Sequence, residues 1–185
     1  MTKSKAGRFF LKSLSIVLFL FAANGFSLSV VLAQSDLKCL ANDHGVLPFM
    51  NEEVIRWKRE TQNQYQDRAF VQGRIVKLIK SRKTHDHLKI QIGRDGSKDT
   101  IEIVYNKAFG KLPKIRSGMS IEACGDYITA REKAGNYPPS PEGAIIHWVH
   151  INTDGHGQLI ERERHEDGFL RIDGVVYGNR PGTRD

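Results

Sequence analysis

The chain has 185 residues, of which 26% are charged and 39% hydrophobic, and its formal net charge is +7. This length allows one domain with a leader rather than two domains. Four of the positive charges lie in residues 1–33, which contain no acids, so the remainder carries only +3. Such a small excess is not by itself the charge signature of a nucleic-acid-binding protein, and any basic patch must come from local clustering.

Residues 1–33 have the features of a secretory signal peptide. A basic start precedes an apolar run over residues 14–23, and Val31 and Ala33 stand at the small-residue positions of a cleavage site. We therefore expect cleavage after Ala33 and an exported protein, periplasmic or secreted, with no stable membrane span. The alternative is an uncleaved leader that anchors the chain in the membrane. The polar residues after Ala23 weaken it, because a span needs about 20 apolar residues.

Two cysteines, Cys39 and Cys124, follow the leader. An even pair in an exported protein is usually oxidised. The sequence therefore predicts a Cys39–Cys124 disulfide that ties the N-terminal segment to the sheet. The alternative is a buried free thiol at Cys124.

Residues 34–68 are expected to form an N-terminal segment with a single helix. Gly45 and Pro48 discourage a long element before residue 50. Asn51 is a candidate N-cap, and apolar residues follow at spacings of three and four, starting with Val54 and Trp57. This pattern predicts a helix over about residues 52–66.

From Ala69 the hydrophobic period changes to two, which is typical of strands. The strand-like runs are AFVQGRIVKLIK, HLKIQIG, TIEIVYN, SIEACGDYI and GAIIHWVHI, and GRDGSKD supplies a polar hairpin connection. Gly73 lies in the first run as a bulge or a point of close approach. In FLRIDGVVYG, Asp173-Gly174 is a strong hairpin signal.

These runs predict a mainly β fold. We expect a small OB-like five-stranded barrel with a C-terminal β-hairpin over residues 69–178, preceded by the N-terminal helix and followed by a flexible tail over 179–185. A β-sandwich is the alternative, although it generally needs more strands.

From about Phe70 to Tyr177 the chain resembles the bacterial exported proteins grouped as domain of unknown function 3465. The corresponding residues are Gly73, His85 or His87, Tyr105-Asn106, Gly118, Gly125-Asp126-Tyr127, the GAIIHWVH segment 143–150, Gly155, the HEDGF segment 165–169 and the GVVY segment 174–177. The chain departs from the family pattern at Tyr105, where a histidine is expected, at Met119, where an acid is expected, and by an insertion near GQLIERER. The resemblance implies an exported OB-like domain and supplies no activity.

Three of the seven histidines fall within the stretch AIIHWVHINTDGHG. A divalent metal held by His147, His150 and His156, with His85 or His87 as a further ligand, is one interpretation. Residues three apart in a regular strand point to opposite faces, however, unless the strand ends near Trp148. The favoured interpretation is structural, with no cofactor, because histidines on half-buried strands usually donate to carbonyl groups. A third option is acid–base catalysis by the segment His165-Glu166-Asp167.

Basic residues gather in two loops that would flank the ligand groove of an OB-fold. The expected ligand-binding residues are Lys80, Arg82, Lys83 and Lys89 around the first loop, Arg131, Lys133 and Tyr137 in the loop between the fourth and fifth strands, and Tyr105 on the groove floor. Cations with an aromatic floor suit a polyanion such as a nucleic acid. The alternative is a pair of solvated loops whose lysines only keep the protein soluble.

Two functions from different classes follow. The first, which we favour, is an exported OB-like binding module for an anionic or oligomeric ligand. The second is a metal-dependent secreted hydrolase that uses the region of His147, His150 and His156. Neither a GxSxG motif nor a phosphate-cradling glycine loop occurs, so the sequence leaves open whether the protein is an enzyme.

Overall fold

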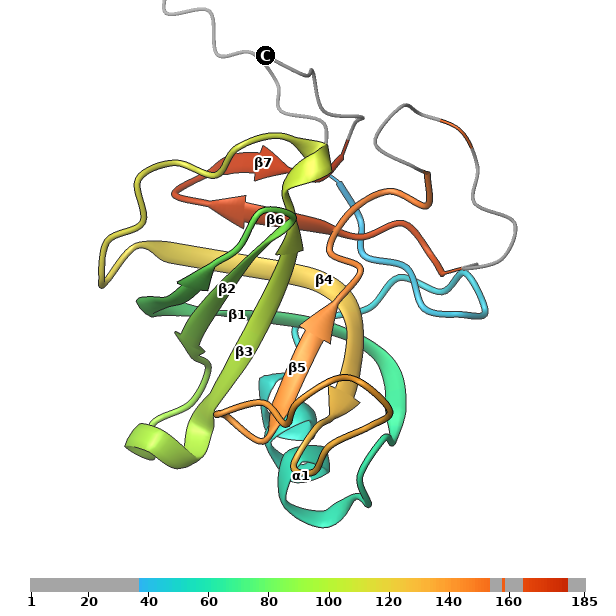
Figure 1. Cartoon of the computed structure of the whole chain (residues 1–185). Coiled ribbons are helices and arrows are strands. Elements are labelled where there is room, and N and C mark those ends of the chain that lie inside the picture. Colours follow the sequence, from blue (N-terminus) through green and yellow to red (C-terminus); the bar gives the residue numbers. More distant parts are fainter. Residues whose placement is uncertain (1–36, 154–157, 159–164, 180–185) are drawn as a thin grey trace, which may run out of the picture. The chain divides into compact units, whose positions relative to one another are not determined.

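The computed structural model describes residues 37–153, 158 and 165–179. The order of elements is α1 (Asn51–Glu60), β1 (Gln66–Ser81), β2 (His85–Gln91), η1 (Gly96–Asp99), β3 (Thr100–Asn106), η2 (Lys107–Phe109), β4 (Ser120–Thr129), β5 (Ala144–His147), β6 (Phe169–Ile172) and β7 (Val175–Tyr177). Within these residues the fold is mainly β, with one α-helix and a C-terminal hairpin, as the sequence predicts (Figure 1). No helix in the described ranges is long and apolar enough to cross a membrane.

Five strands close into a ring. β1 pairs with β2, β2 with β3, β3 with β5, β5 with β4, and β4 with β1 again. All these pairings are antiparallel except β3–β5, so β3 and β5 point the same way in Figure 1. β6 adds to β4 beyond β5, and β7 adds to β6, so the seven strands belong to one sheet rather than to the two sheets of a sandwich.

The ring closes because β1 is long enough to serve two partners. Residues Gln66 to Arg74 pair with β4, and Arg74 to Ser81 pair with β2, so the partners change at Arg74. At the neighbouring Gly73, a Cβ atom would overlap the backbone carbonyl oxygen of Gln91 on β2. The absent side chain therefore lets β1 and β2 approach where the strand bends, as expected for this glycine.

The inside of the ring is filled by alternate residues of its strands. From β2 and β3 these include Leu88, Ile90, Ile101 and Ile103, all fully buried. The helix α1 adds Val54 and Trp57, and the Trp57 ring lies 5.4 Å from the ring of Tyr127. The core thus follows the period-two pattern of the sequence.

The helix α1 ends at Glu60, six residues before the predicted boundary. Thr61 is extended, and its hydroxyl donates to the carbonyl oxygen of Trp57, which stops the helix. Asn51 is not the N-cap: it is the first helical residue, and its side chain bonds instead to the backbone of Gln72 and to the carbonyl oxygen of Ile92. The helix start is therefore fixed by β1 and β2.

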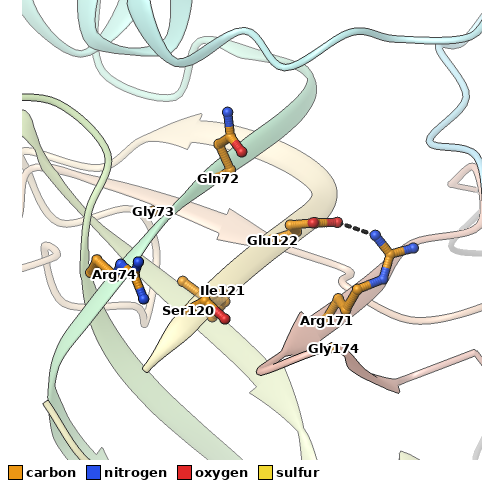
Figure 2. Close-up of a pocket in the computed structure, with 8 residues that line it drawn as sticks. All are labelled: Gln72, Gly73, Arg74, Ser120, Ile121, Glu122, Arg171 and Gly174. Carbon is orange, nitrogen blue, oxygen red and sulfur yellow. Dashed lines mark hydrogen bonds and ion pairs between the residues drawn. The ribbon is translucent and has the colours of Figure 1, made fainter. Parts of the chain in front are cut away.

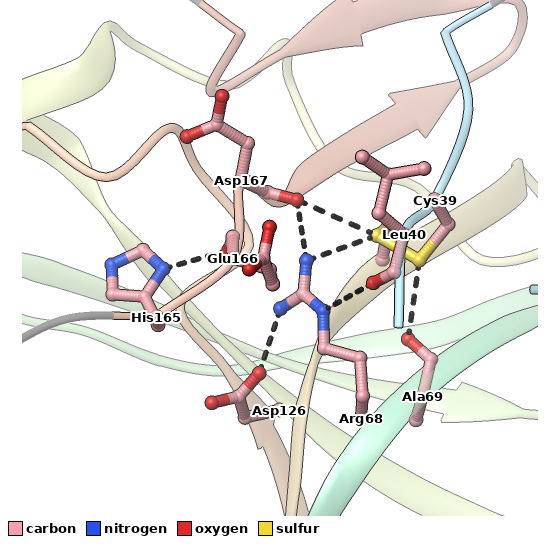
Figure 3. The surroundings of a disulfide bond; sticks show 9 residues. Cys39, Leu40, Arg68, Ala69, Asp126, His165, Glu166 and Asp167 are labelled. Carbon is pink, nitrogen blue, oxygen red and sulfur yellow. Dashed lines mark hydrogen bonds and ion pairs between the residues drawn. A yellow bond between two sulfur atoms is a disulfide. The ribbon is translucent and has the colours of Figure 1, made fainter. Parts of the chain in front are cut away.

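The disulfide Cys39–Cys124 is formed, with Cα atoms 5.6 Å apart, as predicted. Beside it, Arg68 is only 2% exposed (Figure 3). Its guanidinium donates to Asp126 Oδ1 at 2.7 Å, to the Leu40 carbonyl oxygen at 2.9 Å and to the Asp167 carbonyl oxygen. One buried cation thus joins β1, β4, the N-terminal segment and the segment before β6.

The C-terminal hairpin is also as predicted. Asp173 and Gly174 have φ values of 45° and 84° between β6 and β7. Two consecutive positive φ angles are typical of a type I′ turn, whose twist matches that of the strands.

Gly73→Ala is expected to lower the free energy of unfolding by about 1 to 3 kcal/mol, because the added methyl group meets backbone that cannot turn away. The measurement is urea denaturation of the oxidised protein. Gln72→Ala, an exposed neighbour in the same strand, is the control and should change stability by less than about 0.5 kcal/mol. Equal effects of the two substitutions would contradict the close approach.

Removing the disulfide by the double substitution Cys39→Ala and Cys124→Ala is expected to cost about 4 kcal/mol, because the bond closes a loop between residues 85 positions apart. Denaturation of the wild-type protein with and without reductant provides a matched comparison. If the free energy of unfolding falls by less than about 1 kcal/mol in the double variant and in the reduced wild-type protein, the contacts of Arg68 already hold the N-terminal segment.

Candidate functional site

Five histidines gather at the end of the ring where β2 begins and β5 ends. We call His85, His87, His147, His150 and His165 the histidine cluster. The ring centres of His85 and His147 are 5.9 Å apart, and those of His150 and His165 are 5.1 Å apart. The other four histidines also lower the pKa of His147 electrostatically.

The register of the strands explains how β2 and β5 contribute to the cluster. His85 and His87 alternate with the inward-facing Leu88 and Ile90 on β2, so their side chains lie on the outer face of the ring. His87 pairs with Val104 of β3, and β5 lies on the other side of β3, with Ile146 beside Ile103. The outer face of β2, β3 and β5 therefore carries His85 and His87 on one border and His147 on the other.

The strand β5 stops at His147 because Trp148 adopts a φ of 48°. The expected objection to a shared site, that His147 and His150 would point to opposite faces of one strand, therefore does not apply. Glycines approach the backbone of this segment closely. A Cβ atom at each would overlap a carbonyl oxygen: that of His147 for Gly125, of Trp148 for Gly168, and of Val149 for Gly178.

The rings of His150 and His165 are held by the main chain. His150 Nδ1 donates to the carbonyl oxygen of Ile151 at 2.8 Å, and His165 Nδ1 donates to that of Glu166 at 2.9 Å. The His150 ring also stacks on Phe109, with centres 4.0 Å apart. Because Nδ1 carries the proton in both rings, Nε2 keeps its lone pair. This is the hydrogen bonding that the structural interpretation of the sequence expects for His150.

Burial, together with the neighbouring histidines, lowers the pKa of His147 to about 3. Burial likewise lowers the pKa of His150 to about 4, although the bond to Ile151 opposes the shift. The pKa of His85 is lowered mainly by burial and then by His87. His85, His147 and His150 therefore present neutral imidazoles at neutral pH, the form that accepts hydrogen bonds and binds metals.

His87 is oriented by a buried carboxylate. Its Nδ1 lies 2.5 Å from Glu102 Oε1, and Glu102, which is 3% exposed, accepts a second bond from the hydroxyl of Ser140 at 2.5 Å. A carboxylate bonded to Nδ1 fixes the ring and its tautomer. Neither Glu102 nor Ser140 was singled out from the sequence. The available signal was an acid in the middle of the apolar run TIEIVYN.

The first group of expected ligand-binding residues lies at the cluster end of the ring. Arg82 and Lys83 are exposed in the connection between β1 and β2, and Lys80 is partly buried at the end of β1. Lys89 lies further along β2 and forms an ion pair with Glu142 at 2.9 Å. The pKa of Glu142 is lowered because bonds from Thr100 and Lys89 outweigh the effect of burial.

The second group lies at the opposite end of β3. Arg131 and Lys133 are exposed in the connection between β4 and β5, and Tyr137 is 79% exposed. This connection is fastened to the start of β3 by Ser140, and by Glu142, which accepts from Thr100 at 2.5 Å. The two basic loops therefore border the same outer face at its two ends and do not merge into one patch.

Tyr105 does not belong to this face. It is fully buried, and its hydroxyl donates to the carbonyl oxygen of Phe109 at 3.0 Å. Its neighbours at period two, Ile101 and Ile103, are core residues, so Tyr105 shares their inward direction. The expectation of a stacking platform at Tyr105 is wrong for this reason.

His156 lies outside the described residues, so the expected ligand set His147, His150 and His156 is only partly visible. Within the described ranges, and as the side chains are placed, no three His, Cys, Asp or Glu residues are arranged to hold a metal ion. The sequence offered His165 only as an acid–base candidate. In the structure the His165 ring lies beside that of His150, with ring centres 5.1 Å apart.

A separate pocket lies between β1, β4 and the turn after β6 (Figure 2). It is lined by Arg74, whose guanidinium donates to the Gly118 carbonyl oxygen, and by Arg171, which pairs with Glu122. Both arginines thus already have partners on the protein. The histidine cluster and the outer face beside it are the stronger candidate site.

Comparison of the chain with protein-family models, with curated proteins and with solved structures found no match.

The stability of the protein is expected to fall on acidification, by about 2 kcal/mol between about pH 7 and pH 5 from His147 and His150 together. Both have folded pKa values below the unfolded value, so the unfolded chain binds more protons as the pH falls below about 6.5. The figure is roughly half of the full linkage value, because water reaches part of the cluster. The measurement is urea denaturation at several pH values with a chelator present.

The matched variant is His147→Gln, which removes one of the two titrating rings and should flatten the pH dependence. Carboxylates that titrate in the same range are unchanged in this variant. Identical slopes for the variant and the wild type would contradict the lowered pKa of His147.

Proposed function

We propose that the chain is an exported, OB-like binding module for an extended anionic ligand, which lies along the outer face of β2, β3 and β5. The leader sequence and the disulfide support export, because disulfides persist in oxidising compartments. The closed ring of five strands supports the OB-like interpretation, since an OB-fold is a five-stranded barrel that binds ligands on its second and third strands.

The observation that carries this proposal is the position of the two basic loops. The loop of Arg82 and Lys83 lies at one end of β2 and β3, and the loop of Arg131 and Lys133 lies at the other. β3 has seven residues, so the loops are about 20 Å apart along the strand. A ligand that contacts both must be extended, which favours an oligomeric anion over a small one.

The charges between the two loops are largely balanced. Lys89 is paired with Glu142, and Glu102 is bonded to His87 and Ser140. The middle of the face therefore offers imidazole rings and the partly buried side chain of Ile145 rather than free cations. A single-stranded nucleic acid fits this arrangement, because its phosphates can contact cations at the two ends while its bases lie over a flat, weakly charged strip.

The second candidate function is metal-dependent hydrolysis of such a ligand. The specific observation that favours it is the grouping of five histidines beside the same face, with His87 held by a buried carboxylate. A histidine-bound metal activates water for attack on phosphate esters. Cleavage that requires added metal and stops with a chelator would support this candidate.

Binding of single-stranded oligonucleotides is expected to depend on their length. An oligomer of about 12 nucleotides reaches both loops, whereas one of about 2 reaches only one, so the longer should bind at least about tenfold more tightly. The double substitution Arg82→Ala and Lys83→Ala should weaken binding of the long oligomer. It should also reduce the slope of log K against log salt concentration by about 1 to 2. Lys133→Ala should have a smaller effect of the same kind. The measurement is fluorescence anisotropy at several salt concentrations.

The matched control replaces Lys111 and Lys114, two exposed lysines in the connection between β3 and β4, and should leave both affinity and salt slope unchanged. Equal losses for the control and for the Arg82 and Lys83 variant would show only a general charge effect. Equal affinity of the short and long oligomers would contradict a ligand that spans the face.

A further inference from the structure

We propose that His85, His147, His150 and His165 form a binding site for one divalent transition-metal ion, with Zn²⁺ as the reference ion. The four imidazoles come from three parts of the chain: the start of β2, the end of β5 with the residues after it, and the segment before β6. The inference stands apart from anion binding, because the ion alone is the probe and no oligonucleotide is involved.

The spacing of the rings is the first argument. Two imidazoles bound to one zinc ion at about 2.1 Å place their ring centres about 5 to 6 Å apart. The pair His150 and His165, at 5.1 Å, and the pair His85 and His147, at 5.9 Å, both fall in this range. The chain itself connects the two pairs, since His147 and His150 lie three residues apart with the turn at Trp148 between them.

The orientation of the rings is the second argument. Metal-binding histidines almost always engage their second nitrogen with a carbonyl or carboxylate group, which leaves the other free for the ion. His150 and His165 both donate from Nδ1 to a backbone carbonyl oxygen. His85 Nδ1 lies 2.9 Å from the hydroxyl of Thr84. His150 and His165 therefore have Nδ1 engaged and Nε2 available, and the Thr84 hydroxyl lets His85 adopt the same tautomer, because a hydroxyl can accept as well as donate.

The surroundings of the cluster favour movement of side chains over movement of the backbone. As the rings stand, no three are arranged to hold an ion, and Trp148 lies between His147 and His165, with its ring centre 4.7 and 5.7 Å from theirs. Binding thus requires the side chains of His85, His147 and Trp148 to rotate, while His150 and His165 keep their bonds to the main chain. Gly125, Gly168 and Gly178 pack against the carbonyl groups of residues 147–149, which holds this backbone while the side chains rotate.

The class of ion follows from the donor atoms. Four imidazole nitrogen ligands suit Zn²⁺, Cu²⁺ and Ni²⁺, whereas Mg²⁺ and Ca²⁺ require oxygen ligands. Next to the cluster, Asn152 Oδ1 and Thr153 Oγ1 are buried without a hydrogen-bond partner in the described part of the chain. Such oxygens can accept from a water molecule on the ion.

The experiment is a titration of Zn²⁺ into the chelator-treated protein, purified without a histidine tag after expression of the full chain, and followed by calorimetry. We expect one ion per chain with a dissociation constant of about 1 μM or tighter. His147→Ala and His165→Ala, which alter the two separate pairs, should each weaken binding at least about tenfold. His44→Ala removes an exposed histidine outside the cluster and should leave binding unchanged.

A second readout keeps the result independent of whether a variant folds. Cu²⁺ bound to the wild-type protein should give an electron paramagnetic resonance spectrum with coupling to several nitrogen nuclei. The absence of saturable Zn²⁺ binding, or a Cu²⁺ spectrum with oxygen ligands only, would overturn the proposal. Retention of full affinity in both His147→Ala and His165→Ala would do the same. If His87→Gln lost binding while His165→Ala kept full binding, the site would lie on the outer face without His165, and this assignment would be overturned.

Discussion

The structure depends on one strand that changes partner. β1 pairs with β4 along its first half and with β2 along its second half, and the change occurs beside Gly73, where a side chain would meet the backbone of β2. This double pairing closes the ring. Because the β1 edge of β4 is occupied, both β5 and β6 must lie on its other edge, one after the other. The segment between β5 and β6 therefore emerges at the end of the ring where β2 begins, and this brings the histidines together.

Local patterns predicted most of the strands and the hairpin at Asp173-Gly174. The disulfide was predictable because the chain has only two cysteines, so their pairing has no alternative. Features set by tertiary contacts were missed. The helix stops at Glu60 because Thr61 donates back to Trp57 and the chain must then enter β1. Tyr105 was expected on the ligand face, although its spacing from Ile101 and Ile103 already placed it with the core.

The histidine cluster was only partly predictable. His147 and His150 were singled out from their spacing, and the end of β5 at Trp148 resolves whether they can act together. His165 joins them because β6 pairs with β4 next to β5, a long-range arrangement that no local pattern encodes. The carboxylate of Glu102 is similar, since its partners His87 and Ser140 lie on a neighbouring strand and in a distant loop. Arg68 joins β1 to three other segments near the disulfide. Its role was not predictable, because the sequence shows only a cation next to apolar residues.

The position of Trp148 gives the protein a built-in optical probe. The chain has only two tryptophans, and the other, Trp57, is packed in the core against tyrosines. The Trp148 ring lies next to the rings of His147 and His165. Imidazolium groups quench indole emission more strongly than neutral imidazoles do, so a protein in which Trp57 is replaced by phenylalanine would report protonation changes beside Trp148 through its own fluorescence. Events at the cluster could then be followed in real time without any attached label.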